Sequence, residues 1–126
     1  MSIKKVILDI NTKIFEKAIV NAFQTYQYDF LIHNSSFSKE FVRMHHPEVI
    51  LLEVTNTKGK RYIDRLNEIK DIRNVFPDIK IVFLVDEKEN ADIATKVKDA
   101  KQDGLIDSFI YASVSAEYLR AVIDSL

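Results

Sequence analysis

The chain has 126 residues, is 47% hydrophobic and 29% charged, and carries a net charge of −1 with a sequence pI near 6.3. This composition indicates one globular domain with an ordinary core and gives no sign of a nucleic-acid or anionic-membrane surface. The absence of cysteine and the presence of only 2 glycines exclude disulfides, thiolate chemistry and a glycine-rich phosphate loop, and they fit a cytoplasmic location.

Short apolar segments alternate with longer segments of helical periodicity along the whole chain. From the N-terminus, this pattern predicts a strand followed by a helix, five times over. The strands are predicted at residues 3–10, 28–33, 49–54, 79–85 and 106–111. The helices are predicted from apolar residues at helical spacing within 14–23, 37–44, 63–76, 93–100 and 119–126. No apolar run approaches the ~20 residues of a membrane span.

Capping and breaking residues support these boundaries. Candidate N-caps precede three of the helices: Asn11 or Thr12, Ser35 or Ser36, and Ser115. Pro47 and Pro77 follow the second and third helices, which a proline cannot continue. Gly104 suits the C-terminal end of the fourth helix.

Strands separated by helices imply right-handed crossovers and a parallel sheet with helices on both faces. The predicted fold class is therefore α/β, a doubly wound, flavodoxin-like (βα)5 three-layer sandwich with strand order 2-1-3-4-5, in a single domain over residues 1–126. In such a sheet the binding crevice lies beyond the C-terminal strand ends, between the first and third strands. The candidate residues at these strand ends are Asp9, Ile10, Asn11, Thr12, Glu53, Thr55, Asn56, Asp86, Glu87, Tyr111 and Ala112.

Three stretches resemble the receiver domain of bacterial two-component response regulators, with matching order, spacing and length. "PEVILLEV" (47–54) is similar to the family's P-D-L-V-L-L-D-I, and "PDIKIVFLV" (77–85) to its fourth-strand segment. "Gly104" followed by "DSFIY" (107–111) is similar to G-A-x-D-Y-L-x-K. The resemblance covers nearly the whole chain and implies the same fold.

The resemblance also implies a phosphorylation site, whose acidic parts are altered here. Working receivers hold Mg²⁺ with two acids after strand one and accept the phosphoryl group on an Asp at the end of strand three. The acceptor position falls on Glu53, whose carboxylate lies one methylene, about 1.5 Å, further out, and a displacement of ~1 Å can cost about 10²-fold in rate. The acid pair falls on Asp9 and Ile10, or, one residue later, on Ile10 and Asn11; neither register has two acids.

The remaining parts of the implied site are also altered. The hydroxyl-bearing residue after strand four is replaced by Val85, and the lysine after strand five by Tyr111. The loop that contains Thr55 lacks the family's proline. The resemblance therefore implies a pseudo-receiver that is not an enzyme, needs no cofactor and does not depend on Asp phosphorylation.

Alternatives remain for Glu53. It could be a solvated acid at a strand end, a permanently charged stand-in for phospho-Asp, or, with Asp9 and the Thr55 carbonyl, part of a weak Mg²⁺ site. The last would fit an atypical receiver that retains phosphorelay function. A flavodoxin-type phosphate binder is disfavoured, because residues 11–13 (NTK) form too short a loop without glycine.

The family's signalling surface consists of strand five with helices four and five. Here it would carry Phe109, Tyr111, Tyr118 and Arg120, and Tyr and Arg are enriched in interface anchors. We expect a protein partner or a homodimer on this face, and no direct nucleic-acid contact.

A second set of residues is basic and lies before and within the third helix: Lys58, Lys60, Arg61 and Arg65. We interpret it as an exposed charged face, which could meet an acidic partner. "TKGK" (57–60) is interpreted as a turn, and His33 and the pair His45–His46 as structural rather than metal-binding.

Receivers with degenerate sites occur ahead of ParA/MinD-type ATPases of pilus-assembly and mobile-element systems, and ahead of DNA-binding output domains. The stretch "LIDSFIYASVSAEYL" (105–119) resembles the first group. On this basis the domain is expected to be the N-terminal module of a longer protein.

Overall fold

The computed structural model describes residues 4–23, 28–32 and 39–126. The strands are β1 (Lys4–Asp9), β2 (Tyr28–Ile32), β3 (Val49–Val54), β4 (Lys80–Val85) and β5 (Ser108–Tyr111). The helices are α1 (Lys13–Ala22), α2 (Lys39–His45), α3 (Tyr62–Val75), α4 (Ala91–Gln102) and α5 (Ala116–Asp124). Each predicted strand and helix is present, and most of their ends differ from the predicted ends by a few residues.

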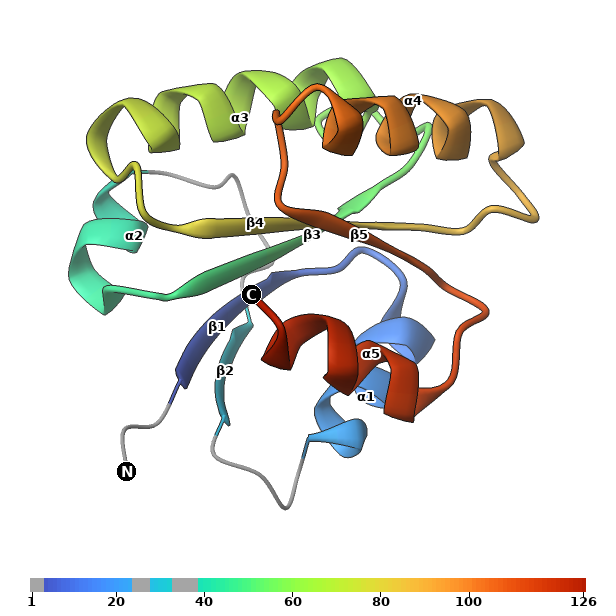
Figure 1. Ribbon diagram of the computed structural model, residues 1–126, viewed down its shortest axis with the longest axis horizontal. Coiled ribbons are helices and arrows are strands. Elements are labelled where there is room, and N and C mark those ends of the chain that lie inside the picture. Colours follow the sequence, from blue (N-terminus) through green and yellow to red (C-terminus); the bar gives the residue numbers. More distant parts are fainter. Residues whose placement is uncertain (1–3, 24–27, 33–38) are drawn as a thin grey trace.

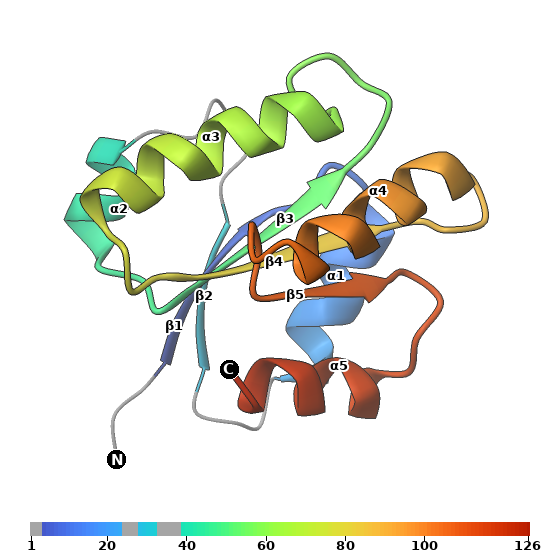
Figure 2. The same ribbon diagram turned by 45° about the horizontal axis from the view of Figure 1, so that its top comes forward.

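All strand pairs are parallel and the strand order is β2-β1-β3-β4-β5, so the predicted α/β fold and strand order are confirmed. Figure 1 shows three layers, with α3 and α4 on one side of the sheet and α1 and α5 on the other. Figure 2, turned by 45°, shows α2 beside α3 on the first side. A pocket lined by Asp9, Ile10, Asn11, Lys13 and Lys60 lies at the C-terminal end of β1, where this strand order places the crevice.

Two apolar cores lie on the two faces of the sheet, because successive side chains of a strand point to opposite faces. Ile7 and Leu52 belong to the core beneath α2, α3 and α4, whereas Leu8 and Leu51 belong to the core beneath α1 and α5. Every residue of β3 is buried. This alternation fixes which face each residue at the strand ends can reach.

Three large members of the predicted apolar stripes are exposed to solvent: Ile14 (72%), Met44 (72%) and Ile63 (56%). On α3 the predicted stripe residues Ile69 and Ile72 are buried, and Leu66 and Phe76 pack against the core. The prediction for α3 was therefore correct except at Ile63, and it missed Arg65, which is buried on the same side of the helix at helical spacing.

The predicted helix ends are largely confirmed. The Ser115 hydroxyl accepts a hydrogen bond from the Tyr118 N–H at 3.1 Å, which caps α5. Gly104 has φ +76 after α4, a conformation that favours glycine. Ser35, Ser36, Phe37 and His33 lie outside the described residues. Among the described helices, none has the length and apolar character that crossing a membrane requires.

Candidate functional site

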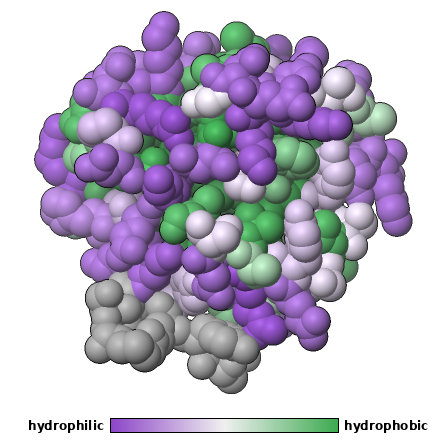
Figure 3. Space-filling model, viewed as in Figure 1, coloured by the Kyte–Doolittle hydropathy of each residue, from purple (hydrophilic) through white to green (hydrophobic). Residues whose placement is uncertain are grey.

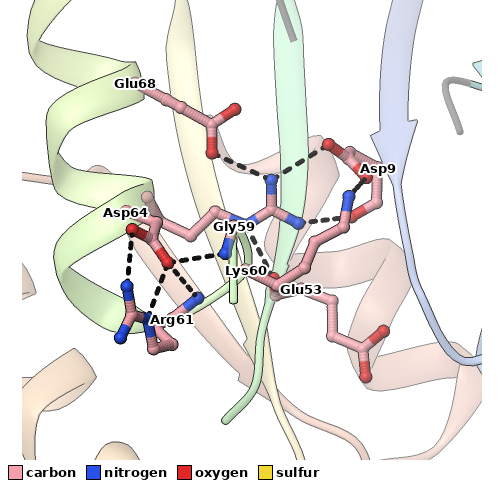
Figure 4. Close-up of polar contacts among 8 residues, drawn as sticks. Asp9, Glu53, Gly59, Lys60, Arg61, Asp64 and Glu68 are labelled. Carbon is pink, nitrogen blue, oxygen red and sulfur yellow. Dashed lines mark hydrogen bonds and ion pairs between the residues drawn. The ribbon is translucent and has the colours of Figure 1, made fainter. Parts of the chain in front are cut away.

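Asp9 lies at the C-terminal end of β1 and is only 2% exposed. Its Oδ1 accepts a hydrogen bond from Lys60 Nζ at 2.7 Å, and its Oδ2 accepts one from Arg65 Nη1 at 2.9 Å (Figure 4). Both cations come from the segment that follows β3. The acid at the first metal-binding position is therefore paired with two positive charges of its own chain.

Arg65 is completely buried and makes four hydrogen bonds. Besides Asp9 Oδ2, it donates from Nε to the Glu53 carbonyl oxygen at 2.8 Å and from Nη2 to the Asp9 carbonyl oxygen at 3.2 Å. Nη1 also donates to Glu68 Oε1 at 3.2 Å. The guanidinium thus joins the ends of β1 and β3 to α3, using the fixed fork geometry that arginine offers.

The interpretation of the basic residues as one exposed face was wrong for two of the four. Arg65 is buried and the Lys60 side chain is 20% exposed, because both are directed at Asp9. Lys58 and Arg61 are exposed. Arg61 pairs with Asp64 at 3.0 Å, and this hydrogen bond lowers the pKa of the Asp64 carboxyl.

Glu68 completes the buried cluster of charges. Its carboxylate lies within hydrogen-bond distance of Arg65, and its side chain is 21% exposed. Burial raises the pKa of Glu68, and the positive charge of Arg65 only partly offsets this. The cluster of Asp9, Lys60, Arg65 and Glu68 therefore contains two acids and two cations.

Glu53 is 2% exposed, so its interpretation as a solvated acid was wrong. Its Oε1 accepts a hydrogen bond from the Thr12 N–H and its Oε2 accepts one from the Thr12 hydroxyl, both at 2.8 Å. Because the hydroxyl is used in this way, Thr12 occupies the N-cap position of α1 without a side-chain cap bond. Glu53 instead ties the end of β3 to the start of α1.

The two acids point to opposite faces of the sheet. Asp9 follows Ile7 on the α3 side, and Glu53 follows Leu51 on the α1 side. Figure 4 shows the Glu53 carboxylate directed away from Asp9 and Lys60. Ile10 is buried on the α1 side and offers no ligand, whereas Asn11 is exposed and lines the same pocket as Asp9 and Lys60.

These residues do not fit the Mg²⁺ site of a working receiver. All four carboxylate oxygens of Asp9 and Glu53 accept hydrogen bonds from the protein, and Asp9 is paired with two cations. The described residues contain no group of three or more His, Asp or Glu side chains that could hold a metal ion. A divalent cation at Asp9 would have to displace both Lys60 and Arg65.

The other predicted positions also lie at the C-terminal ends of the strands. Val85 is buried in the core, and Tyr111 is its direct neighbour on β5. The Thr55 hydroxyl accepts from the Thr57 N–H at 3.1 Å, and the Thr55 N–H donates to the Lys60 carbonyl at 2.9 Å. Thr55 therefore shapes the turn that carries Lys60.

The predicted interaction face is partly exposed. Phe109 and Tyr111 are half-buried with ring centroids 5.3 Å apart, and Lys101 lies 5.9 Å from the Phe109 ring. Tyr118, on α5, is 54% exposed, and Arg120 lies on the same helix. Figure 3 shows hydrophobic side chains gathered over β5, between α4 and α5, within a hydrophilic surface.

Sequence reasoning missed the roles of Thr12, Lys60, Arg65 and Glu68. One signal was available: Arg65 recurs with Ile69 and Ile72 at helical spacing, so it lies on the buried stripe of α3. A charge on a buried stripe needs a charged partner. Asp9 is the acid at the end of the neighbouring apolar strand β1.

No protein-family model matches the chain, and no curated protein matches its sequence. Solved structures do match it over nearly its full length. A response regulator from Thermotoga maritima is 19% identical, with a TM-score of 0.74, and the match covers 99% of this chain and 97% of that one. The signal receiver domain of a Bacteroides fragilis two-component response regulator is 17% identical, with a TM-score of 0.74 and 98% and 96% coverage.

A CheY-like protein (tadZ) from Pseudomonas aeruginosa PAO1 is 12% identical, with a TM-score of 0.75 and 97% and 98% coverage. At these identities the similarity establishes the fold. The chain therefore has a receiver-like α/β fold, and its function has to be argued from the residues at its crevice.

Proposed function

We propose that the chain is a non-catalytic pseudo-receiver, a protein-interaction module that acts in the cytoplasm without phosphorylation of an acidic residue. One observation carries this proposal: Asp9 is buried against the guanidinium of Arg65 and the ammonium of Lys60. The crevice thus has fixed positive charge from its own chain at the carboxylate that would help to hold a divalent cation.

Acceptance of a phosphoryl group needs a free carboxylate, a cation and donors for the phosphoryl oxygens. Glu53 is engaged at both oxygens by Thr12. Val85 has no hydrogen-bond donor in its side chain, and Tyr111 has no positive charge. Each part that the reaction requires is therefore occupied or replaced.

Recruitment of Mg²⁺ is opposed by the same network. A cation approaching Asp9 meets two positive charges, and removal of Arg65 from its partners would leave a fully buried charge unpaired. Breaking such a buried pair costs about 3–5 kcal/mol. The arginine and lysine therefore make the crevice independent of the metal.

The surface formed by α4, β5 and α5 is the proposed contact for a partner or a second copy of the chain, through Phe109, Tyr111, Tyr118 and Arg120. Tyr118 is exposed and Phe109 and Tyr111 are half-buried, and aromatic residues and arginine are the residue types that anchor interfaces. The resemblance of residues 105–119 to receivers that precede ParA/MinD-type ATPases supports a role in such a system.

The proposal is tested by exposing the protein to acetyl phosphate, or to beryllofluoride, in the presence of Mg²⁺. Intact-mass spectrometry should find no phosphoryl adduct, and thermal unfolding should not respond to Mg²⁺ with beryllofluoride. A phosphorylatable receiver domain serves as the positive control. A mass increment that disappears in Glu53→Gln would refute the proposal and favour an atypical receiver with phosphorelay function.

The interaction face is tested separately with Tyr118→Glu. Tyr118 is 54% exposed, so the substitution should leave the fold intact on circular dichroism. In sedimentation velocity across protein concentration, self-association should weaken at least about tenfold, which corresponds to about 1.4 kcal/mol. Tyr118→Phe retains the ring and should associate like the wild type. A wild type that remains monomeric at every concentration would exclude the homodimer, and the face would then require a different protein as its partner.

A further inference from the structure

The loops at the C-terminal edge of the sheet are joined to one another by side chains. Asn56 Nδ2, after β3, donates to Asn90 Oδ1, before α4, at 2.7 Å. The Ser113 hydroxyl, after β5, donates to Glu87 Oε1, after β4. Side-chain contacts thus run from the crevice to the edge of the interaction face.

The contact between Glu87 and Ser113 lies beside the two altered site positions. Val85 and Tyr111 are paired neighbours on β4 and β5. Glu87 lies two residues after Val85, and Ser113 lies two residues after Tyr111. The Ala112 N–H donates to the Val85 carbonyl at 2.9 Å. The contact therefore joins the two loops where a working receiver uses its hydroxyl-bearing residue and its lysine.

Each of the two loops contains hydrogen bonds of its own that form a turn, so the contact joins two ordered segments. Asp86 Oδ1 accepts from the Lys88 N–H at 3.1 Å, and the Asp86 carbonyl accepts from the Asn90 N–H at 2.9 Å. On the other side, the Val114 N–H donates to the Tyr111 carbonyl at 3.2 Å.

We propose that Glu87 and Ser113 form an internal clasp that holds the β4–α4 and β5–α5 loops, and with them Tyr111, in one arrangement without a bound phosphoryl group. Its role in presenting the interaction face rests on the proposed pseudo-receiver function. The clasp itself is a feature of the fold and can be tested without any partner.

Burial of the Glu87 carboxylate opposes formation of the clasp. Glu87 Oε2 is buried and has no hydrogen-bond partner among the described residues. Burial of an unpaired carboxylate oxygen is unfavourable, so the contact contributes less than its geometry suggests. Ser113 is exposed, and a negative charge at this position would repel Glu87 and open the clasp.

Hydrogen exchange measured by NMR tests this proposal, with the amides of Asn90, Ala112 and Val114 as probes. Glu87→Ala and Ser113→Ala should each speed exchange at these amides about tenfold, since each removes the side-chain hydrogen bond between the loops. Combining the two substitutions should add nothing, because both break the same contact. Ser113→Asp should give the largest increase.

Two matched variants serve as controls. Glu87→Gln keeps a carbonyl oxygen that can accept from Ser113 and should exchange like the wild type. Glu89→Ala removes the same charge from an exposed position of the same loop and should also have no effect. Circular dichroism of every variant checks that the domain remains folded.

The proposed clasp would be refuted if the probe amides exchange at the same rate in Glu87→Ala and Glu89→Ala. It would also be refuted if the effects of Glu87→Ala and Ser113→Ala add in the double variant. These outcomes are distinct from failure of the proposed function. A phosphoryl adduct at Glu53 with normal clasp exchange would overturn the proposed function alone. Unchanged exchange without any adduct would overturn the clasp alone.

Discussion

Asp9 and Glu53 end neighbouring strands and are equally buried, yet the protein satisfies them by different means. Asp9 is paired with two cations, Lys60 and Arg65, whereas Glu53 accepts hydrogen bonds from the neutral groups of Thr12. Asp9 faces the layer of α3, and Glu53 faces the layer of α1.

The difference indicates that the two halves of the crevice respond differently to substitution. On the α3 side, loss of one cation leaves the buried Asp9 carboxylate with a single counter-charge in place of two, which is a costly change. On the α1 side, loss of one hydroxyl leaves a carboxylate that still accepts a backbone hydrogen bond. The α3 side should therefore be the more sensitive, and both sides should be insensitive to divalent cations.

Arg65→Met should have the largest effect. It removes four hydrogen bonds from a fully buried position and leaves Asp9 with Lys60 as its only cation. We expect a loss of about 3–5 kcal/mol in the free energy of unfolding, measured by urea denaturation. The control Arg61→Met removes an exposed cation just before α3, whose partner Asp64 is not fully buried, and should change stability much less.

Adding Asp9→Asn to Arg65→Met should recover part of the lost stability, because it removes the buried carboxylate that has lost one of its two counter-charges. The two substitutions should therefore be non-additive by about 0.5–3 kcal/mol. Additive effects would mean that Arg65 acts through packing alone, and the comparison between the two sides of the crevice would fail.

Thr12→Val should have an intermediate effect. The change keeps the size of the side chain but removes the hydroxyl that donates to Glu53 Oε2. Loss of one hydrogen bond to a buried charged group should lower the free energy of unfolding by about 1.5–3 kcal/mol. Thr12→Ser retains the hydroxyl and should stay close to the wild type. A Thr12→Val protein as stable as the wild type would show that the backbone N–H suffices for Glu53.

Much of the fold was predictable because it depends on periodicity. Residues 49–54 were predicted as a strand and form β3 with the same bounds, since a doubly covered central strand is apolar at almost every position. Ser115 and Gly104 marked the ends of α5 and α4 through local backbone chemistry that needs no tertiary contact. Strand order was predicted from the alternation of strands and helices together with the rules for parallel crossovers.

The site was only partly predictable, because its contacts join residues far apart in the sequence. Replacement of the receiver family's aspartate, hydroxyl-bearing residue and lysine by Glu53, Val85 and Tyr111 could be identified from sequence positions alone. Pairing of Arg65 with Asp9 spans 56 residues and depends on how α3 is rotated against the sheet. The apolar pattern correctly predicted that Ile69 and Ile72 face the sheet, but a pattern of apolar residues cannot identify a buried arginine beside them.

Glu68→Gln should have the smallest effect, and the size of this effect depends on pH. Burial raises the pKa of Glu68 above its ordinary value of 4.5. The folded state therefore binds this proton more tightly than the unfolded state does. The free energy of unfolding should fall as the pH rises from about 4.5 through the folded pKa, and the full loss remains at higher pH.

Glutamine does not titrate and still offers Arg65 a carbonyl oxygen, so Glu68→Gln should flatten this part of the pH profile. Near neutral pH the variant should be more stable than the wild type, by less than about 1 kcal/mol, since Glu68 is partly exposed. Asp64→Asn provides a control of opposite sign, because Arg61 lowers the pKa of Asp64 and stabilises its ionised form. Thermal unfolding of the wild type and both variants across this pH range measures the two slopes. A Glu68→Gln protein that is less stable than the wild type at neutral pH would mean that the charge of Glu68 is needed beside Arg65, and that the α3 side requires both of its acids.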